Sequence, residues 1–243
     1  TISGGYRKKH RPLSPRRSVD QWQSKEMIKK GSSKITCLFL DIGGVLLTDG
    51  WNTEFREQAA AKFGLDFAEM EDRHRLVFGV YEEGKLSLDE YLDRTVFYEE
   101  RQFTCGQFKE FMFACSKADA EMIELVRVLK AQYGLKTIVV SNEARELNAY
   151  RIRKFGLGEF IDAFVSSCFV GMRKPDAEIF RLALDIAQVP AEQIVYLENT
   201  EMYVDIADSF GINSIHHVDY GSTRIKLEAF GLIGDIATDM VSA

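Results

Sequence analysis

The feature that most constrains the fold is an alternation of two kinds of segment along the chain. From about residue 35 onward, short apolar runs rich in β-branched residues alternate with longer runs whose apolar residues recur at helical spacing. This alternation is typical of parallel α/β proteins, whose strands are covered on both faces and therefore carry little polarity. We predict an α/β fold with a Rossmann-like parallel sheet covered by helices on both faces. The predicted strands are residues 35–40, 137–141, 163–167, 193–198 and 213–218.

Amphipathic runs between these strands predict helices that return the chain to the sheet by right-handed crossovers. Gly134, Gly156 and Gly211 stand at the ends of three such runs, where a helix C-terminus favours glycine. Pro175 begins another run and suits a first helical turn, where its missing N–H costs nothing. The predicted helices cover residues 119–134, 141–156, 174–188 and 200–211.

One long interval, residues 51–116, contains no convincing buried strand. Its segments have helical character, and Ser87 with Glu90 forms a plausible capping box for one of them. Because the interval is far too long for a simple crossover, we interpret it as a helical cap inserted after the first strand, with its many aromatic residues forming its own core. The predicted domains are a basic N-terminal arm (1–34), a core (35–50 and 117–243) and the cap (51–116).

Charge is unevenly distributed along the chain. Residues 1–34 hold ten Lys and Arg against two carboxylates, and the remaining residues carry a net charge of about −14. A flexible arm is the simplest interpretation of the basic stretch, and an acidic body argues against an enzyme of nucleic acids. No apolar run approaches the roughly 20 residues of a membrane helix.

The four cysteines form neither a C-x-x-C pair nor a spacing typical of zinc sites. They do not suggest a disulfide framework either, so we expect a reducing, cytoplasmic setting. The N-terminal stretch also lacks the apolar segment of a secretory signal.

Asp41 ends the first apolar run, "ITCLFLD", and is followed closely by Gly43 and Gly44. In open parallel sheets, ligands bind beyond the carboxyl ends of the strands. Two glycines there let the main chain approach a ligand and point its N–H groups inward, as around a bound phosphate. A single D-x-G-G would be explained better by a capped turn.

Further polar residues occupy corresponding places in the sequence, and these strengthen the functional interpretation. Two pairs stand at the ends of predicted strands, and a lysine within "VGMRKPDAEIF" stands at the start of a predicted helix. These residues are Ser141 and Asn142, Glu198 and Asn199, and Lys174.

In order and type, these residues resemble the four motifs of the haloacid dehalogenase superfamily. The segments "FLDIGGVLL" and "GMRKPDAEIF" carry most of the resemblance, which covers about residues 35–218 and includes a helical cap between the first two motifs. The reading D-x-G-G-V resembles the first motif of some members of the helical-cap (C1) subgroup. The resemblance implies a phosphatase-like hydrolase acting on a small phosphorylated substrate.

The resemblance also implies roles for individual residues. Asp41 would attack phosphorus and form an aspartyl-phosphate, which divides one difficult displacement into two easier ones. Lys174 would offset the charge of carboxylate and phosphate in the loose transition state. The implied catalytic residues are Asp41, Ser141 and Lys174, and the implied phosphate-binding residues are Gly43, Gly44, Ser141, Asn142 and Lys174.

The resemblance also implies Mg²⁺ as the cofactor. This ion prefers octahedral oxygen ligation with few protein ligands. Typical members supply these oxygens from the positions of Asp41, the Gly43 carbonyl, Glu198 and Asn199. Here Asn199 offers a neutral amide where a carboxylate is usual, and weaker metal binding is expected.

A second departure is Gly43, which stands where phosphatases of the superfamily usually carry a second Asp that acts as general acid and base. Such assistance is typically worth about 10²–10⁴-fold in rate. Asp49 and the cap segment "YEEGKLS", with Glu82, Glu83 and Lys85, could supply an acid, although a turn aspartate and a solvated surface explain them more simply. His216 and His217 are better explained by packing and exposure than by ligation.

Three functions therefore remain open from the sequence. The leading hypothesis is an Mg²⁺-dependent phosphohydrolase whose cap selects the substrate. A degenerate binding or regulatory protein, which binds a phosphorylated ligand or a partner protein without turnover, is the alternative suggested by Gly43 and Asn199. A 2-haloacid dehalogenase, in which Asp41 attacks carbon without a metal, fits the missing second Asp but not the glycine loop.

Overall fold

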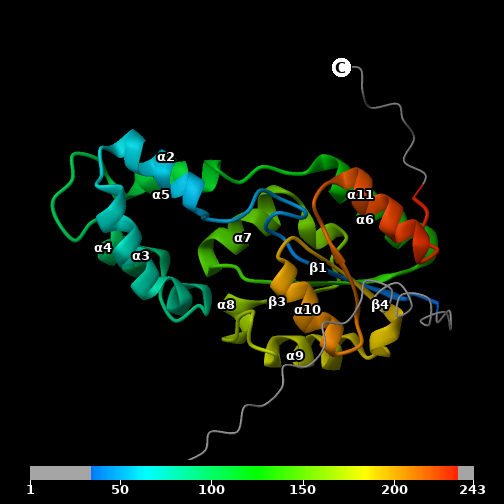
Figure 1. Cartoon of the computed structure of the whole chain (residues 1–243). Coiled ribbons are helices and arrows are strands. Elements are labelled where there is room, and N and C mark those ends of the chain that lie inside the picture. Colours follow the sequence, from blue (N-terminus) through cyan, green and yellow to red (C-terminus); the bar gives the residue numbers. More distant parts are fainter. Residues whose placement is uncertain (1–33, 235–243) are drawn as a thin grey trace, which may run out of the picture. The chain divides into compact units, whose positions relative to one another are not determined.

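The computed structural model describes residues 34–234, so the predicted basic arm lies almost entirely outside the described residues. Five parallel strands form one sheet in the order β3-β2-β1-β4-β5 (Figure 1). All five predicted strands are confirmed, with ends that differ by at most two residues. The strands are β1 (Cys37–Leu40), β2 (Lys136–Ser141), β3 (Ala163–Ser166), β4 (Ile194–Glu198) and β5 (Asn213–His216).

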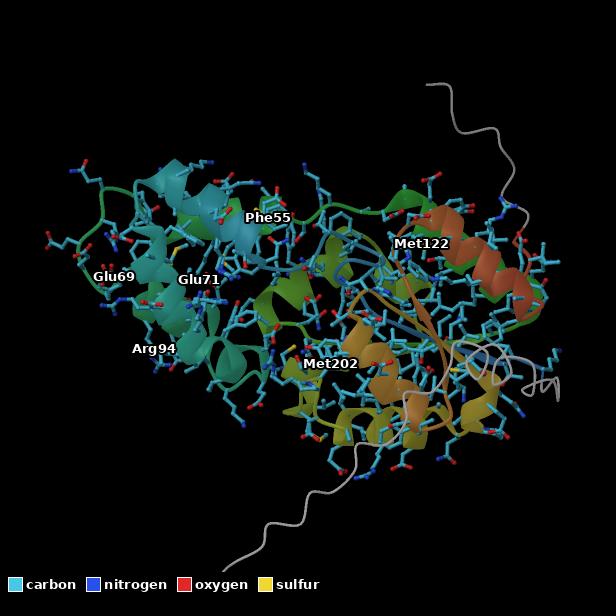
Figure 2. The ribbon with its side chains drawn as sticks, in the orientation of Figure 1. Phe55, Glu69, Glu71, Arg94, Met122 and Met202 are labelled. Carbon is cyan, nitrogen blue, oxygen red and sulfur yellow. The ribbon has the colours of Figure 1, made fainter. Side chains whose placement is uncertain are left out.

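Side chains of successive strand residues point to opposite faces of the sheet, and each face has its own hydrophobic core. Leu38 and Leu40 belong to one core, together with Met122 of α6 (labelled in Figure 2). Cys37 and Phe39 belong to the other. Helices α6 (Ala120–Tyr133) and α11 (Tyr220–Ala229) contribute to the first core, and α9 (Glu178–Ala187) and α10 (Glu201–Ser209) to the second. The predicted two-sided coverage of a Rossmann-like sheet is therefore confirmed.

The helix boundaries follow the glycine signals only in part. Gly134 directly follows α6 in the left-handed conformation, as predicted. Gly156 and Gly211 are also left-handed but lie two residues beyond the last residues of α7 (Arg145–Lys154) and α10. Helix α7 begins four residues later than predicted, because Ser141 still belongs to β2 and the next residues form the loop above the sheet.

The interpretation of Pro175 as a first-turn residue is wrong. Helix α9 begins at Glu178, and Pro175 precedes it in a loop after a cis peptide bond with Lys174. This loop places the lysine at the sheet edge before the helix starts. Three helices were not predicted individually: α3 (Phe67–Glu82), α8 (Ser167–Val170) and α11.

A helical insertion between β1 and β2 is present, as predicted. It consists of α2 (Thr53–Phe63), α3, α4 (Leu88–Thr95) and α5 (Cys105–Ala114). The capping box of Ser87 and Glu90 starts α4, and Thr104 with Gln107 forms a second one at α5. The insertion has its own hydrophobic core, in which aromatic residues such as Trp51, Tyr81, Tyr91 and Phe108 are buried.

Hydrogen bonds connect this insertion to the sheet domain. The Ser167 hydroxyl donates to the Glu82 carbonyl at 2.8 Å, and the Leu88 N–H donates to Glu146 Oε1 at 3.0 Å. Arg173, one residue before Lys174, forms an ion pair with Glu82 at 2.6 Å. The cap is thus attached next to the loop that carries Lys174. Within residues 34–234, no helix is long and apolar enough to cross a bilayer.

Candidate active site

The carboxyl ends of three neighbouring strands bring the predicted site residues together. Asp41 follows β1, Ser141 ends β2 and Glu198 ends β4, and β1 lies between the other two strands in the sheet. All three residues are buried. The site therefore lies where the chain's connections diverge from the middle of the sheet, which is the usual ligand-binding place in this kind of fold.

Lys174 reaches this point from the loop before α9. Its Nζ lies 3.1 Å from Asp41 Oδ2 and 2.5 Å from Glu198 Oε2, and the lysine is 1% exposed. The Asn142 side chain fixes the loop, because its amide nitrogen donates to the Lys174 carbonyl and its oxygen accepts from the Lys174 N–H. The phosphate-binding role predicted for Asn142 stays a prediction, and its side chain positions the lysine loop.

The electrostatics of the site are unbalanced, because one buried ammonium faces two buried carboxylates. Burial raises the pKa of Asp41 to about 8, although Lys174 opposes the increase and Glu198 adds to it. Burial alone would lower the pKa of Lys174, but the two carboxylates outweigh this effect and raise it. Among the described residues the site thus has two acidic groups for one ammonium, and an additional cation would favour the ionised form of Asp41.

The Ser141 hydroxyl lies beside the Asp41 carboxylate. The N–H of Ile42 donates to Asp41 Oδ1 at 2.9 Å and approaches Ser141 Oγ at 3.4 Å. A hydrogen bond from Ser141 also acts to lower the pKa of Asp41. Ser141 is therefore adjacent to Asp41, and its catalytic role stays a prediction.

The glycine loop is shaped by the neighbouring Asn199. Gly44 is left-handed (φ +74°), and a Cβ at this position would overlap the Asn199 side chain. The N–H of Gly44 donates to the Leu47 carbonyl at 2.7 Å, so it is not available to a phosphate. The predicted phosphate contact of Gly44 stays a prediction, and in this structure the absence of a side chain at position 44 makes room for Asn199.

The Asn199 amide tests whether a cation fits the site. With its nitrogen turned inward, the amide donates to the Gly43 carbonyl at 3.3 Å and to Glu198 Oε1 at 3.0 Å. With its oxygen turned inward, Asn199 would instead direct an acceptor at both the Gly43 carbonyl and Glu198 Oε1, at the same distances. Adjacent oxygens around octahedral Mg²⁺ lie about 2.9 Å apart, so these three predicted ligands suit the ion in that orientation.

The metal donor set is sparse in carboxylates. Among residues 34–234, no group of three or more His, Cys, Asp or Glu side chains could hold a metal ion. A cation at Asp41 would depend on the Gly43 carbonyl and the Asn199 amide as well as on carboxylate oxygens. These neutral donors are consistent with the weaker metal binding expected from the sequence.

Tyr196 is a site residue that the sequence reasoning missed. Its hydroxyl lies 3.1 Å from Lys174 Nζ and 2.5 Å from Glu198 Oε2, and its ring is fully buried. A signal was available, because residues two apart on a strand face the same side and Tyr196 precedes Glu198 by two. The N–H of Thr200 holds the other Glu198 oxygen at 2.8 Å.

The weaker candidates separate into two groups. Glu82 is committed to its ion pair with Arg173, and Glu83 pairs with Lys85 at 2.7 Å. Asp49 differs from them, because its Oδ1 would lie 3.2 Å from a Cβ placed on Gly43.

His216 is the last residue of β5 and His217 follows it, and each makes a hydrogen bond within the core domain. His217 is buried and hydrogen-bonds the Thr223 hydroxyl at 2.8 Å. His216 Nε2 instead supports the main-chain carbonyl of Asn199 at 3.0 Å.

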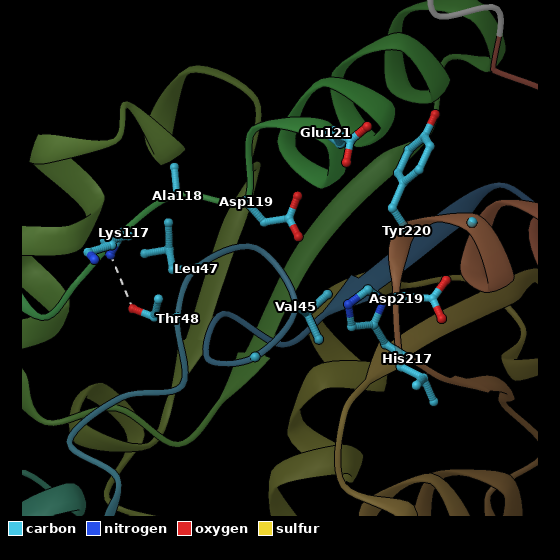
Figure 3. A pocket seen from close by; sticks show the side chains of 13 residues that line it. Val45, Leu47, Thr48, Lys117, Ala118, Asp119, Glu121, His217, Asp219 and Tyr220 are labelled. Carbon is cyan, nitrogen blue, oxygen red and sulfur yellow. Dashed lines mark hydrogen bonds between the residues drawn. The ribbon is translucent and has the colours of Figure 1, made fainter. Parts of the chain in front are cut away.

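An open hollow lies beside the glycine loop, bordered by Gly44 and the start of α6 and α11 (Figure 3). Two of its carboxylates already cap helices: Asp119 accepts from the Met122 N–H and Asp219 from the Ser222 N–H. Lys174 does not line this hollow. The chemistry of the site is therefore better assigned to the cluster around Asp41.

Known proteins resemble this chain in both sequence and fold. A phosphorylated carbohydrates phosphatase of Thermotoga maritima is 28% identical over 206 residues, which cover 81% of this chain and 93% of the relative. A sesquiterpene phosphatase of Aspergillus oryzae is 28% identical over 114 residues, covering 46% of this chain and 57% of that protein.

A haloacid dehalogenase family enzyme of Bacteroides thetaiotaomicron, solved with magnesium and inorganic phosphate, has a similar backbone. Its TM-score is 0.65 at 19% identity, over 78% of this chain and 98% of that one. At this identity the likeness concerns the fold. The family model of haloacid dehalogenase-like hydrolases matches residues 35–207, a span that includes Asp41, Lys174 and Glu198. Family match and fold agree, so this chain belongs to the haloacid dehalogenase-like hydrolases.

Proposed function

We propose that this hydrolase is a phosphatase of small phosphorylated substrates that works through an aspartyl-phosphate on Asp41. The observation that carries the proposal is the position of Lys174, whose ammonium lies 3.1 Å from the Asp41 carboxylate at the carboxyl end of the sheet. A buried ammonium beside a nucleophile suits a reaction in which negative charge arrives and is redistributed.

In the first step, an Asp41 oxygen would form a bond to phosphorus as the bond to the leaving oxygen breaks. Water would then attack phosphorus and release the carboxylate. Lys174 neutralises charge in both steps, and the Ser141 hydroxyl donates a hydrogen bond to a phosphoryl oxygen. Asn142 holds the lysine loop in register with Asp41.

Mg²⁺ is the proposed cofactor, held by Asp41, the Gly43 carbonyl and Asn199, with Glu198 beside them. When bound, it would supply positive charge that offsets the phosphate and the excess carboxylate. The convergence of oxygens at Asn199 supports this assignment.

The proposed substrate is a phosphorylated carbohydrate or a metabolite of similar size. The name of the Thermotoga relative, which matches 81% of this chain, supports this class. We also propose that residues 51–116 form a C1-type cap that selects the substrate over a core of residues 35–50 and 117–243.

The test compares wild type with Asp41→Asn in the hydrolysis of p-nitrophenyl phosphate, with and without Mg²⁺, followed by a panel of sugar phosphates. We expect Mg²⁺-dependent turnover that the substitution abolishes. Equal rates in the two proteins would exclude the proposal. Ligand-induced thermal stabilisation without product would indicate the binding-only alternative, and chloride release from a chloroacid without Mg²⁺ would indicate a dehalogenase.

A further inference from the structure

The space that a side chain at position 43 would fill is already occupied. A Cβ on Gly43 would lie 3.2 Å from Asp49 Oδ1 and 3.6 Å from Asp49 Cα. Gly43 is not among the left-handed glycines, so its main chain could carry a side chain without strain. Asp49, six residues further along the chain, therefore lies against the place where a side chain at position 43 would begin.

The Asp49 carboxylate has no other task in the described structure. Within residues 34–234 it accepts no hydrogen bond and forms no ion pair, and the adjacent helix α2 is capped by Asn52 instead. The charges of Arg151, Glu198 and Lys174 act on it, so it lies within electrostatic reach of the Asp41 site. The side chain is exposed and can therefore meet a bound substrate.

The main chain beside Asp49 is firmly held. Thr48 donates from its N–H to the Lys117 carbonyl at 2.9 Å and from its hydroxyl to the Cys115 carbonyl at 2.9 Å. The buried Arg151 guanidinium donates to the Thr48 carbonyl at 3.3 Å. A carboxylate next to such an anchor is well placed to act repeatedly from one position, which acid–base catalysis requires.

We propose that Asp49 is the general acid and base of this site, reaching the place above Gly43 from the far end of the loop. This inference rests on the proposed phosphatase function. As Asp41 attacks phosphorus, the bond to the leaving oxygen breaks and that oxygen takes the proton of the Asp49 carboxyl. The Asp49 carboxylate then accepts a proton from the attacking water, whose oxygen bonds to phosphorus while the bond to Asp41 breaks. Each cycle returns both side chains to their starting forms.

The experiment measures kcat/KM for aryl phosphates whose leaving phenols span a range of pKa, in wild type, Asp49→Asn and Asp49→Ala. Loss of a general acid affects poor leaving groups most, so we expect a decrease of about 10²–10⁴-fold for phenyl phosphate and a much smaller one for dinitrophenyl phosphate. Intact-mass spectrometry should show phosphorylated protein accumulating in the variants, since the second step lacks its base.

A rescue variant makes the test specific. Asp49→Ala removes the side chain above Gly43, so Gly43→Asp in that background should fit and restore most of the activity on phenyl phosphate. Asp72→Asn, an exposed carboxylate on α3, serves as the matched control and should behave as wild type.

The outcomes separate this inference from the proposed function. An unchanged leaving-group dependence in both Asp49 variants, with Asp41→Asn inactive, would overturn the role of Asp49 alone. Turnover by Asp41→Asn equal to that of wild type, or no turnover by wild type on any aryl phosphate, would overturn both proposals.

Discussion

Two buried ion clusters, one in the cap and one at the sheet, use the same kinds of groups to opposite effect. In the cap, Arg56 binds Glu71 through two hydrogen bonds of 2.7 and 2.9 Å (Glu71 is labelled in Figure 2). Its remaining donors reach Thr53 and the Trp51 carbonyl. At the sheet, the single ammonium of Lys174 is shared by two carboxylates.

The pKa values show what this difference means. Hydrogen bonds from Arg56 lower the pKa of Glu71, so its charged form is favoured in the folded cap. Burial raises the pKa of Asp41 to about 8, so its charged form is disfavoured until further positive charge arrives. The pair of Arg56 and Glu71 stabilises the cap. The cluster of Lys174 with two carboxyl groups lowers stability but provides a reactive site.

The largest effects are expected from removing the cation of each cluster, Lys174 or Arg56. These two substitutions also test most directly whether one cluster serves catalysis and the other stability. Lys174→Met should lower kcat for an aryl phosphate by about 10²–10³-fold or more, because a group that stabilises the transition state is lost. Arg56→Met should lower stability but leave kcat per folded molecule near that of wild type. Kinetics normalised to the folded fraction check both outcomes, and equal losses of kcat would contradict the distinction.

Removing one carboxylate from each cluster should change stability in opposite directions. Glu71→Gln leaves Arg56 uncompensated at a site where the two side chains are 6% and 11% exposed, so we expect a loss of about 3 kcal/mol. Asp41→Asn removes a carboxyl group whose ionisation the folded protein disfavours, and should raise the free energy of unfolding of the metal-free protein by about 1 kcal/mol. Urea unfolding measures both, and destabilisation by Asp41→Asn would refute the charge imbalance.

The effect of pH should also differ between the two regions. Burial lowers the pKa of His74, which hydrogen-bonds Tyr91 in the cap, to about 4 from its ordinary 6.5. The unfolded chain therefore gains a proton as pH falls from 6.5 to 4 while the folded cap does not, and stability decreases in this window. Arg56 also lowers this pKa and Glu71 opposes it. His74→Gln should flatten the dependence in urea unfolding at pH 4–7.

The pH dependence of stability that Asp41 contributes has the opposite sign to that of His74. Because its folded pKa is raised from 3.8 to about 8, the folded metal-free protein holds a proton that the unfolded chain releases, and stability decreases as pH rises through this window. The difference between wild type and Asp41→Asn across pH 4–8 isolates this contribution. A difference that does not change with pH would contradict it.

The last prediction concerns the effect of metal on stability. Mg²⁺ binding to the folded state only should stabilise wild type by about 1–3 kcal/mol near saturation. In Asp41→Asn, most of the stabilisation by Mg²⁺ should be lost. In Glu71→Gln, Mg²⁺ should give the same stabilisation as in wild type, although the metal-free variant is less stable. Thermal unfolding with Mg²⁺ titration tests the site without requiring turnover, and equal gains in Asp41→Asn and wild type would place the metal elsewhere.

Much of the fold could be predicted because its signals are local. A strand buried on both faces needs an apolar run, and all five runs became strands within two residues of their predicted ends. The box of Ser87 and Glu90 and the left-handed Gly134 likewise depend on neighbours within one helical turn. The position of Pro175 was misjudged because its loop serves Lys174 rather than the helix.

The site was predictable as a set of residue types but not as a set of contacts. Asp41, Ser141, Lys174 and Glu198 do converge, since the carboxyl ends of parallel strands meet at one edge. The contact of the Asn142 side chain with the main chain of the Lys174 loop was not predicted, because that loop lies more than thirty residues away in the sequence.

By itself, then, the sequence determined the α/β architecture and which residues end each strand, because hydrophobic period and turn chemistry are written over a few neighbouring positions. Only the tertiary structure decided that Asn199 fills the space above Gly44 and that Asp49 fills the space above Gly43. These contacts depend on how loops from different strands fold over one another, and residue spacing along the chain does not specify that distance.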